Sequence, residues 1–125
     1  MKKKILSITI AGIWITVSEF VRNESLLKTY WISYYNSIGL KFETLPINGI
    51  LWFIWGIIFA YLIMKLYEKF SFGETIFLSW ISGFVMMWIT IYNLQVLPLD
   101  ILLYAIPLSL VEIFVAVIII KKLLD

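Results

Sequence analysis

The segment from residue 101 to residue 120 constrains the fold of this chain more than any other feature. Its only polar members are Tyr104, Ser109 and Glu112. A helix of about 20 residues is about 30 Å long, which matches the hydrocarbon core of a lipid bilayer. Glu112 lies near the middle, where an ionisable group is costly and usually faces protein or water rather than lipid. The segment therefore predicts a membrane-spanning helix with a candidate functional residue at its centre.

The composition extends this prediction to almost the whole chain. Of its 125 residues, 62% are hydrophobic and 14% are charged, and the mean hydropathy is +0.98. Soluble domains have about 45–50% apolar and about 25% charged residues. The apolar residues form four segments, at residues 5–21, 47–64, 75–94 and 101–120. Because most connections between them are short, we expect one all-α domain over residues 1–125, with four transmembrane helices in an antiparallel bundle.

Charged residues at the ends of the segments predict the orientation. Lysines at positions 2–4 precede the first segment, but no small-residue cleavage site follows, so we expect it to remain as a helix rather than act as a signal peptide. With the N-terminus inside, seven of the ten basic residues lie on the cytoplasmic side, and Arg22, Lys28 and Lys41 lie outside. This bias places both termini in the cytoplasm. We therefore expect a multi-pass protein of a bacterial inner membrane, with the lipid bilayer as its surroundings and no nucleic-acid partner.

The one long connection, residues 22–46, is rich in aromatic side chains. Apolar and aromatic residues recur at helical spacing over residues 25–39, which predicts a short amphipathic helix at the outer interface, where Trp and Tyr are favoured. Asn23 or Ser25 can cap its first turn, and Gly39 can end it. The helix is either an aromatic anchor alone or part of a functional surface.

Two parts of the sequence are similar to each other. Residues 14–19 (WITVSE) resemble residues 88–93 (WITIYN), and residues 46–48 (PIN) resemble residues 98–100 (PLD). The pattern predicts a parallel pseudo-repeat of two helix pairs about an axis along the membrane normal. Short matches in an apolar-rich sequence also arise by chance, so both interpretations stay open.

Small and polar residues lie at spacings of three and four on each expected helix, which places them on one face. In lipid such faces turn inward, because small residues allow close packing and polar residues avoid hydrocarbon. The expected packing positions are Gly12, Gly56, Ala60 and Gly83. The candidate polar-site residues are Thr16, Glu19, Asn23, Thr90, Asn93, Ser109 and Glu112, with Ser79 beside them. For the Ser and Thr residues among these, we favour a simple bond to the backbone of the same helix.

The two intramembrane glutamates admit different roles. Glu19 can form a structural salt bridge with Arg22, three residues later, near the outer interface. If Arg22 instead points outward, Glu19 and the matched Asn93 can form a polar pocket open to the outside. Glu112 has no basic residue within a helical turn, so we expect it to be neutral at pH 7, either in a transport path or bonded to another helix or subunit. A kink at Pro107 beside it can line a cavity.

The chain contains no cysteine and no histidine. Disulfides, thiol chemistry, the usual zinc sites and His-ligated haem are therefore excluded, as are Ser–His and Cys–His nucleophiles. We expect neither a cofactor nor a metal. Whether the protein is an enzyme stays open, although few reactive groups remain for catalysis.

Three elements of the layout carry a resemblance to other membrane proteins. They are the polar end of the first helix at residues 18–20, the aromatic segment at residues 31–40, and a last helix that begins at Asp100. In this order, over nearly the full chain, they resemble small uncharacterised bacterial four-helix integral membrane proteins. The resemblance implies a four-helix fold and a bacterial inner membrane, and no particular activity.

Three functions from different classes are compatible with these features. The first is an oligomeric transporter or channel, with a dimer favoured, in which Glu112 binds a proton or cation. The second is a non-catalytic accessory or scaffold subunit of a larger membrane complex, for which the small-residue faces suffice. The third is an enzyme that acts on a lipid or quinone through Glu19 or Glu24 at the outer interface, without the usual reactive partners. We expect the first, because a buried acid is more costly than a buried apolar residue.

Overall fold

The computed structural model describes residues 1–43 and 45–125, and this part of the chain is helical without strands. Four helical stretches are long and apolar enough to cross a membrane. They are Lys2–Leu26, Pro46–Tyr67, Phe72–Asn93 and Leu99–Leu124. The apolar composition and these four stretches identify a multi-pass membrane protein.

Two of the four spans contain a π-helical turn. The first span is helix α1 (Lys2–Phe20) followed by the π turn η1 (Val21–Leu26). The second is α3 (Pro46–Tyr67). The third is α4 (Phe72–Trp80), the π turn η2 (Ile81–Val85) and α5 (Met86–Asn93). The fourth is a 3₁₀ turn, η3 (Leu99–Ile101), followed by α6 (Leu102–Leu124).

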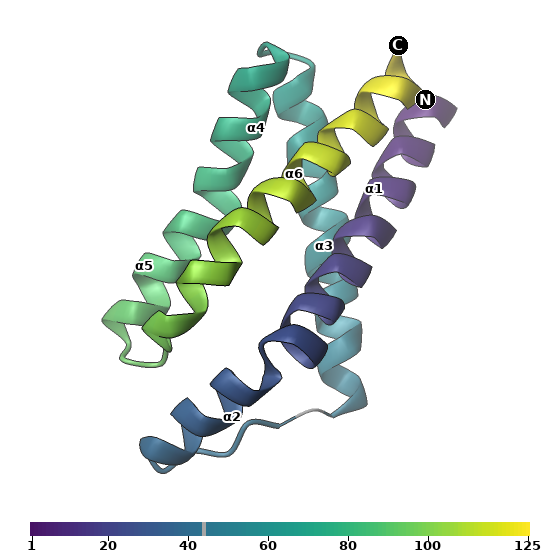
Figure 1. Cartoon of the computed structure of the whole chain (residues 1–125). Coiled ribbons are helices and arrows are strands. Elements are labelled where there is room, and N and C mark those ends of the chain that lie inside the picture. The colour runs from purple at the N-terminus through teal and green to yellow at the C-terminus, as the bar shows by residue number, and fades with distance from the viewer. Residues whose placement is uncertain (44) are drawn as a thin grey trace.

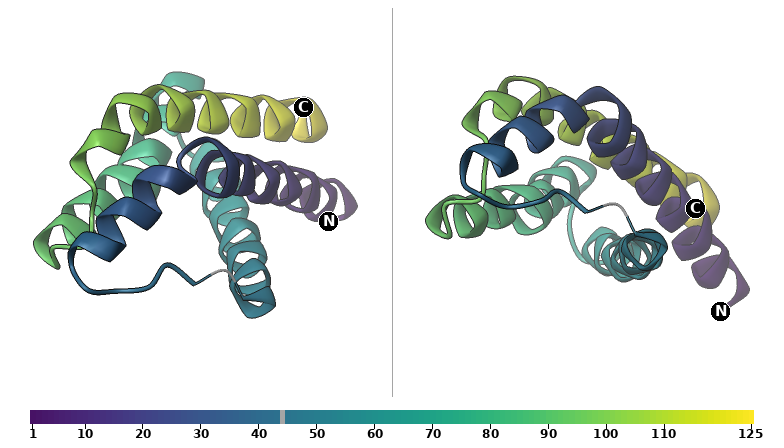
Figure 2. Two further views of the ribbon diagram at one scale, coloured as in Figure 1. Left: turned by 60° about the horizontal axis from the view of Figure 1, so that its bottom comes forward. Right: turned by 90° about the horizontal axis from the view of Figure 1, so that it is seen from below.

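The helices α1, α3 and α6 all contact one another, and α1 makes its largest contacts with the other two. α4 packs against both α6 and α3. Both chain ends and the turn between α3 and α4 lie at one end of the molecule, whereas the α5–α6 turn lies at the other (Figure 1). At that second end, helix α2 (Lys28–Ser37) extends from the end of the first span (Figure 2). Tyr34 of α2 donates a hydrogen bond to the carbonyl of Gln95, 2.9 Å away, which joins α2 to the α5–α6 turn.

The four predicted apolar segments coincide with the four spans, and each observed helical stretch extends further in at least one direction. The extensions contain the polar residues at the helix ends, which sequence hydropathy alone leaves out. The start of α4 shows how such an end is stabilised. The hydroxyl of Ser71 accepts a bond from the backbone N–H of Glu74, and the Glu74 carboxylate accepts one from the backbone N–H of Ser71, in a capping box.

Helix α2 is present within the predicted interfacial segment, but the predicted caps at its start are wrong. It begins after Leu27 without a side-chain cap. Asn23 and Ser25 cannot cap it because they lie inside η1, which continues the first span. The predicted end is confirmed: Gly39 follows the helix with a positive φ of 76°, and its N–H donates to the carbonyl of Asn36.

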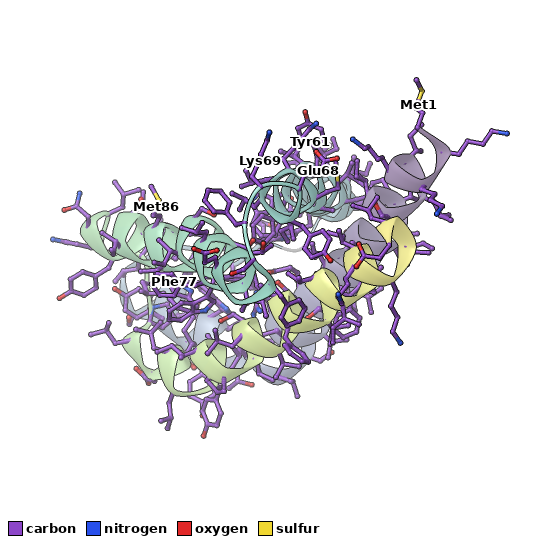
Figure 3. All side chains as sticks on the ribbon, turned by 90° about the horizontal axis from the view of Figure 1, so that it is seen from above. Met1, Tyr61, Glu68, Lys69, Phe77 and Met86 are labelled. Carbon is purple, nitrogen blue, oxygen red and sulfur yellow. The ribbon has the colours of Figure 1, made fainter. Side chains whose placement is uncertain are left out.

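The π turn η2 changes which face of the third span is buried. An α-helix turns by about 100° per residue, so a turn with one extra residue rotates all that follows by about that angle. Ser79, before η2, is buried as expected. Thr90 and Asn93, after it, are exposed, so the prediction that they face the interior is wrong, and Trp88 is buried instead. Met86 points away from the bundle and is 58% exposed (Figure 3).

The four expected packing positions, Gly12, Gly56, Ala60 and Gly83, are all buried. Gly56 of α3 lies against α1, where an added Cβ would be 2.6 Å from Thr16 Oγ1 and 3.1 Å from the carbonyl oxygen of Gly12. A Cβ at Gly83 would overlap the ring of Phe59. The absence of side chains at these points therefore allows the spans to approach closely, as membrane helices require.

Polar contacts fasten both ends of the chain to the end of α3. Lys4 forms an ion pair with Glu68, and the hydroxyl of Tyr67 donates to the carboxylate of Asp125, 2.9 Å away. The hydrogen bond from Lys4 lowers the pKa of Glu68, and the hydrogen bond from Tyr67 lowers the pKa of Asp125. Glu68 and Lys69 mark this end in the view of Figure 3.

Candidate functional site

Arg22 joins two buried carboxylates from different helices. Its Nη2 atom lies 2.5 Å from Glu19 Oε1, and its Nη1 atom lies 3.5 Å from Glu112 Oε1. Glu19 precedes Arg22 by three residues near the end of α1, whereas Glu112 comes from α6. We call these three side chains the carboxylate–arginine cluster.

The cluster is enclosed by protein. Glu112 has no exposed surface, and Glu19 and Arg22 are only 2% and 5% exposed. Phe84 of η2 lies on one side, with its ring centroid 5.0 Å from Arg22 Cζ, a distance suited to a cation–π interaction. Arg22 comes from η1, so one π turn supplies a member of the cluster and the other supplies the aromatic ring beside it. Turns of this kind occur frequently at functional sites.

A second set of polar groups holds the cluster in position. The amide of Asn23 donates to Glu19 Oε2 over 3.1 Å, and the indole N–H of Trp31 donates to the amide oxygen of Asn23 over 3.1 Å. The indole N–H of Trp14 donates to the backbone carbonyl of Glu112 over 2.9 Å. These bonds connect the cluster to α2, and they bind α1 to α6 at the level of Glu112.

The cluster contains more unpaired acceptor atoms than unpaired donor atoms. The contacts of Arg22 with the two carboxylates are close, but none has the geometry of a hydrogen bond. Glu19 Oε1, both carboxylate oxygens of Glu112 and Nη1 of Arg22 are buried without a hydrogen-bond partner. A buried polar atom in this state is costly, so each one requires a physical explanation. Two carboxylates that share one guanidinium are a clear source of this deficit.

A cavity of about 280 Å³ reaches the cluster from the end of the molecule that holds α2. Arg22 lies in its wall, and five aromatic residues line it as well: Trp31, Tyr35, Phe42, Trp52 and Trp88. A neighbouring cavity of about 300 Å³ is lined by Glu19 and Thr16. The two cavities share Asn23, Glu24, Asn48 and Trp52 as wall residues. Two members of the cluster, Arg22 and Glu19, therefore border open space, whereas Glu112 lines neither cavity.

The predicted hydroxyl residues mostly bond to their own helices. Thr16, Thr90 and Ser109 each donate to a carbonyl three or four residues earlier, over 2.8–2.9 Å, as expected. Ser109 also accepts a bond from the indole N–H of Trp80 over 2.9 Å, which ties α6 to α4. The buried hydroxyl of Ser79 differs from the prediction, because it has no hydrogen-bond partner.

The predicted local ion pair between Glu19 and Arg22 is present, and it is buried inside the bundle. The alternative pocket of Glu19 with Asn93 does not form, since Arg22 points inward and Asn93 is exposed. Glu19 and Asn93, which occupy matched positions in the two similar sequence segments, therefore lie in different environments. Pro107 lies inside α6, which continues as one helix from Leu102 to Leu124.

Sequence reasoning does not predict the contact between Arg22 and Glu112. Glu112 has no basic neighbour along its own helix, and the charge pattern of the sequence assigns Arg22 to the outer side. The spacing from Glu19 to Arg22 was the available signal, because an arginine within one turn of an intramembrane acid has reason to turn inward. Phe84 gave no signal, since apolar residues fill most of its span. Among the described residues, no group of three or more Asp and Glu side chains could hold a metal ion.

No protein-family model, curated protein or solved structure matches this chain. The layout resemblance to small bacterial four-helix membrane proteins therefore stays a prediction. A function for the chain rests on the chemistry of the carboxylate–arginine cluster and of the cavities beside it.

Proposed function

We propose that this chain is a small membrane transporter or channel that moves protons, cations or a small solute with the help of Glu112. The observation that carries the proposal is the carboxylate–arginine cluster beside the two cavities. Ionisable side chains that pair with each other inside a membrane protein and border a cavity are typical of ion pathways and proton relays. A purely structural interior is cheaper to build from apolar residues.

The cavities and the cluster supply one half of a pathway. In the other half, Ala11, Ile63, Ala116 and Ile120 are packed without any exposed surface. A complete pathway therefore requires a second conformation or a second copy of the chain. We expect an oligomer, with a dimer favoured, of antiparallel four-helix bundles.

The charge pattern supports an inner-membrane orientation with both termini in the cytoplasm. Arg22 is buried in the cluster, so only Lys28 and Lys41 of the ten basic residues belong to the outer loop. Burial of Arg22 makes the bias toward cytoplasmic lysines larger than the sequence count suggested. The bacterial inner membrane stays the expected location.

The alternative is a non-catalytic accessory or scaffold subunit of a larger membrane complex. The closed packing of the second half favours it, because the interior side chains there, such as Ala11, Ile63 and Ala116, have no exposed surface. In that case the carboxylate–arginine cluster would fix the register of α1 against α6 and would conduct nothing.

Flux through liposomes that contain the purified protein tests the proposal. We expect the wild-type protein to carry a proton or cation current down an imposed gradient, recorded with entrapped pH-sensitive and potential-sensitive dyes. Glu112→Gln should reduce this flux by about 100-fold or more, the size of effect typical of removing a positioned proton-transfer group. Helical content measured by circular dichroism should stay unchanged.

Glu68→Gln is the matched control. It makes the same chemical change at the opposite end of the bundle, where Glu68 pairs with Lys4 and Lys65. We expect its flux to equal that of the wild-type protein. An absence of flux from wild-type protein across several ions and pH gradients, with one stoichiometric partner co-purifying, would establish the accessory-subunit alternative instead.

A further inference from the structure

We propose that the carboxylate–arginine cluster holds one exchangeable proton, shared between Glu19 and Glu112 and kept in place by Arg22. This inference deepens the proposed function, on which any role of the proton in transport rests. It names the proton as the ion that the cluster binds, and it assigns the binding to a pair of carboxyl groups rather than to Glu112 alone.

The charges of the ionised cluster do not balance. Glu19 and Glu112 carry two negative charges when both are ionised, and Arg22 supplies one positive charge. The remaining charge would be buried with at most 5% exposure of any of the three side chains. An uncompensated charge in such a place costs several kcal/mol, so a group that can neutralise itself does so. One bound proton removes the excess charge completely.

The ionised cluster also leaves carboxylate oxygens without hydrogen-bond donors. Three carboxylate oxygens in the cluster, two from Glu112 and Oε1 of Glu19, have no donor. Protonation of one carboxyl group adds an O–H donor and removes one charged acceptor. The side chain of Glu19 approaches the Glu112 carboxyl group closely enough to interact with it. The added proton therefore has an acceptor on the other carboxyl group.

Among the residues that the structure describes, the surroundings of Glu112 contain no other group that could supply the charge. From α1 the polar neighbours are Ser18 and Glu19, and from η1 the neighbour is Arg22. α4 contributes the neutral Ser79, and its one charged residue, Glu74, is held in the capping box at the far end. The described residues of α3 that face the interior are uncharged. The charge deficit thus belongs to the cluster itself.

A proton fits this site better than a metal cation. Metal ions that prefer oxygen need several oxygen ligands around one centre, and the described residues offer no group of three or more acidic side chains for that purpose. The guanidinium of Arg22 also contacts both carboxylates, and its positive charge repels a metal cation there. A proton needs only one acceptor oxygen on each side.

The proton has a route to water on one side. Glu19 lines one cavity and Arg22 lines the other, and Glu24 borders both. A proton from water in these cavities can bind to Glu19 and pass to Glu112, and the reverse transfer releases it. No bond other than O–H forms or breaks, so the exchange is balanced without a further reactant.

Infrared spectroscopy of the purified protein tests the proposal directly. The sample is the full chain at pH 7 in a detergent without ester or acid groups, with ¹³C-labelled glutamate to separate Glu bands from Asp bands. The six acidic residues outside the cluster are half-buried or exposed, and any band they give is common to the wild-type protein and the variants below. We expect one protonated glutamate per chain in the wild-type protein, and its band should disappear reversibly as the pH is raised.

Two matched variants should remove this band. In Glu112→Gln and in Glu19→Gln, one carboxylate remains opposite Arg22, the charges balance, and no protonated glutamate is expected. Arg22→Gln should show two protonated glutamates where it folds. A wild-type protein without the band, a band that persists in either glutamine variant, or a band that sodium ions abolish at constant pH would overturn the inference.

The infrared and flux measurements separate the inference from the proposed function. A protonated pair without flux would support the proton site and overturn transport. Flux that depends on Glu112 without a protonated pair would support transport and overturn the shared proton.

Discussion

Arg22 contacts two carboxylates that would otherwise repel each other inside the bundle. Its planar guanidinium directs Nη2 toward Glu19 on α1 and Nη1 toward Glu112 on α6. The ammonium group of a lysine is a single compact charge and could not present two fixed donors in this way. Arg22 Cζ also lies over the ring of Phe84. At the scale of single residues, Arg22 is therefore the group on which the site depends.

Removal of this guanidinium should destabilise the protein strongly. We expect Arg22→Met to lower the free energy of unfolding by about 3–5 kcal/mol, because it leaves buried charges without a partner. Reversible unfolding in mixed micelles, followed by tryptophan fluorescence, measures the change.

A triple variant provides the control for this prediction. Arg22→Met combined with Glu19→Gln and Glu112→Gln contains no buried charge and should recover most of the lost stability. A triple variant as unstable as Arg22→Met would show that packing by the arginine side chain, rather than charge balance, is what matters.

The π turns act at the scale of the helical element. η1 keeps residues 21–26 in the first span, and η2 turns Phe84 and Trp88 toward the interior. Contacts between spans depend on small residues as well. Gly56 lies where α3 meets α1, whereas Gly49, two turns earlier on the same helix, has no atom within 4 Å of an added Cβ.

These two glycines allow a matched comparison within α3. We expect Gly56→Leu to lower the free energy of unfolding by about 1–3 kcal/mol, because the larger side chain forces α1 away or into strained rotamers. Gly49→Leu should cost little, since its side chain enters open space. Unfolding of both variants in mixed micelles provides the measurement, and equal effects would show that close contact at Gly56 is not required.

The sequence predicted the four spans, the aromatic helix after the first, the burial of Glu112 and the small packing residues. These features depend on local composition and on spacing along one helix. The partner of Glu112 could not be predicted in that way, because Arg22 reaches it across the bundle. Thr90 and Asn93 were placed inward by regular α-helical spacing, and the π turn η2 breaks that regularity without a distinct sequence signal.

The whole molecule has two different ends. One end contains α2, the aromatic residues of the long connection and the cavities that reach the cluster. The other contains both chain ends, the α3–α4 turn and most of the lysines. A continuous interior of Ala11, Ile63 and Ala116 separates them. A difference of this kind is expected for a protein that faces two different compartments.

The orientation of the two ends can be measured with introduced cysteines, because the chain contains none of its own. Lys41 lies in the long connection and Lys69 in the α3–α4 turn, and both are exposed. We expect a membrane-impermeant thiol reagent to modify Lys41→Cys in intact cells and Lys69→Cys only after permeabilisation. The reverse pattern would contradict cytoplasmic termini.

Acid should loosen the end of the bundle that holds the chain ends. The pKa of Glu68 is lowered in the folded state by Lys4, so the pair stabilises the fold above the ordinary pKa range of glutamate, and this contribution is lost as the pH falls through the lowered value. We expect hydrogen-exchange protection of the first turns of α1 to decrease on acidification, after correction for intrinsic exchange rates. In Glu68→Gln this decrease should be smaller, since the pair is already absent.

Most of the buried polar site comes from one short stretch of chain, since Glu19, Arg22 and Asn23 lie within five consecutive positions and only Glu112 comes from elsewhere. The site can therefore be written as a signature: Glu, Arg and Asn at positions i, i+3 and i+4 near the end of a first span, with a single Glu in the middle of a last span. The lipid-facing positions need only be apolar and are free to change. Chains with no overall similarity to this one, but with this signature, would be expected to share its chemistry.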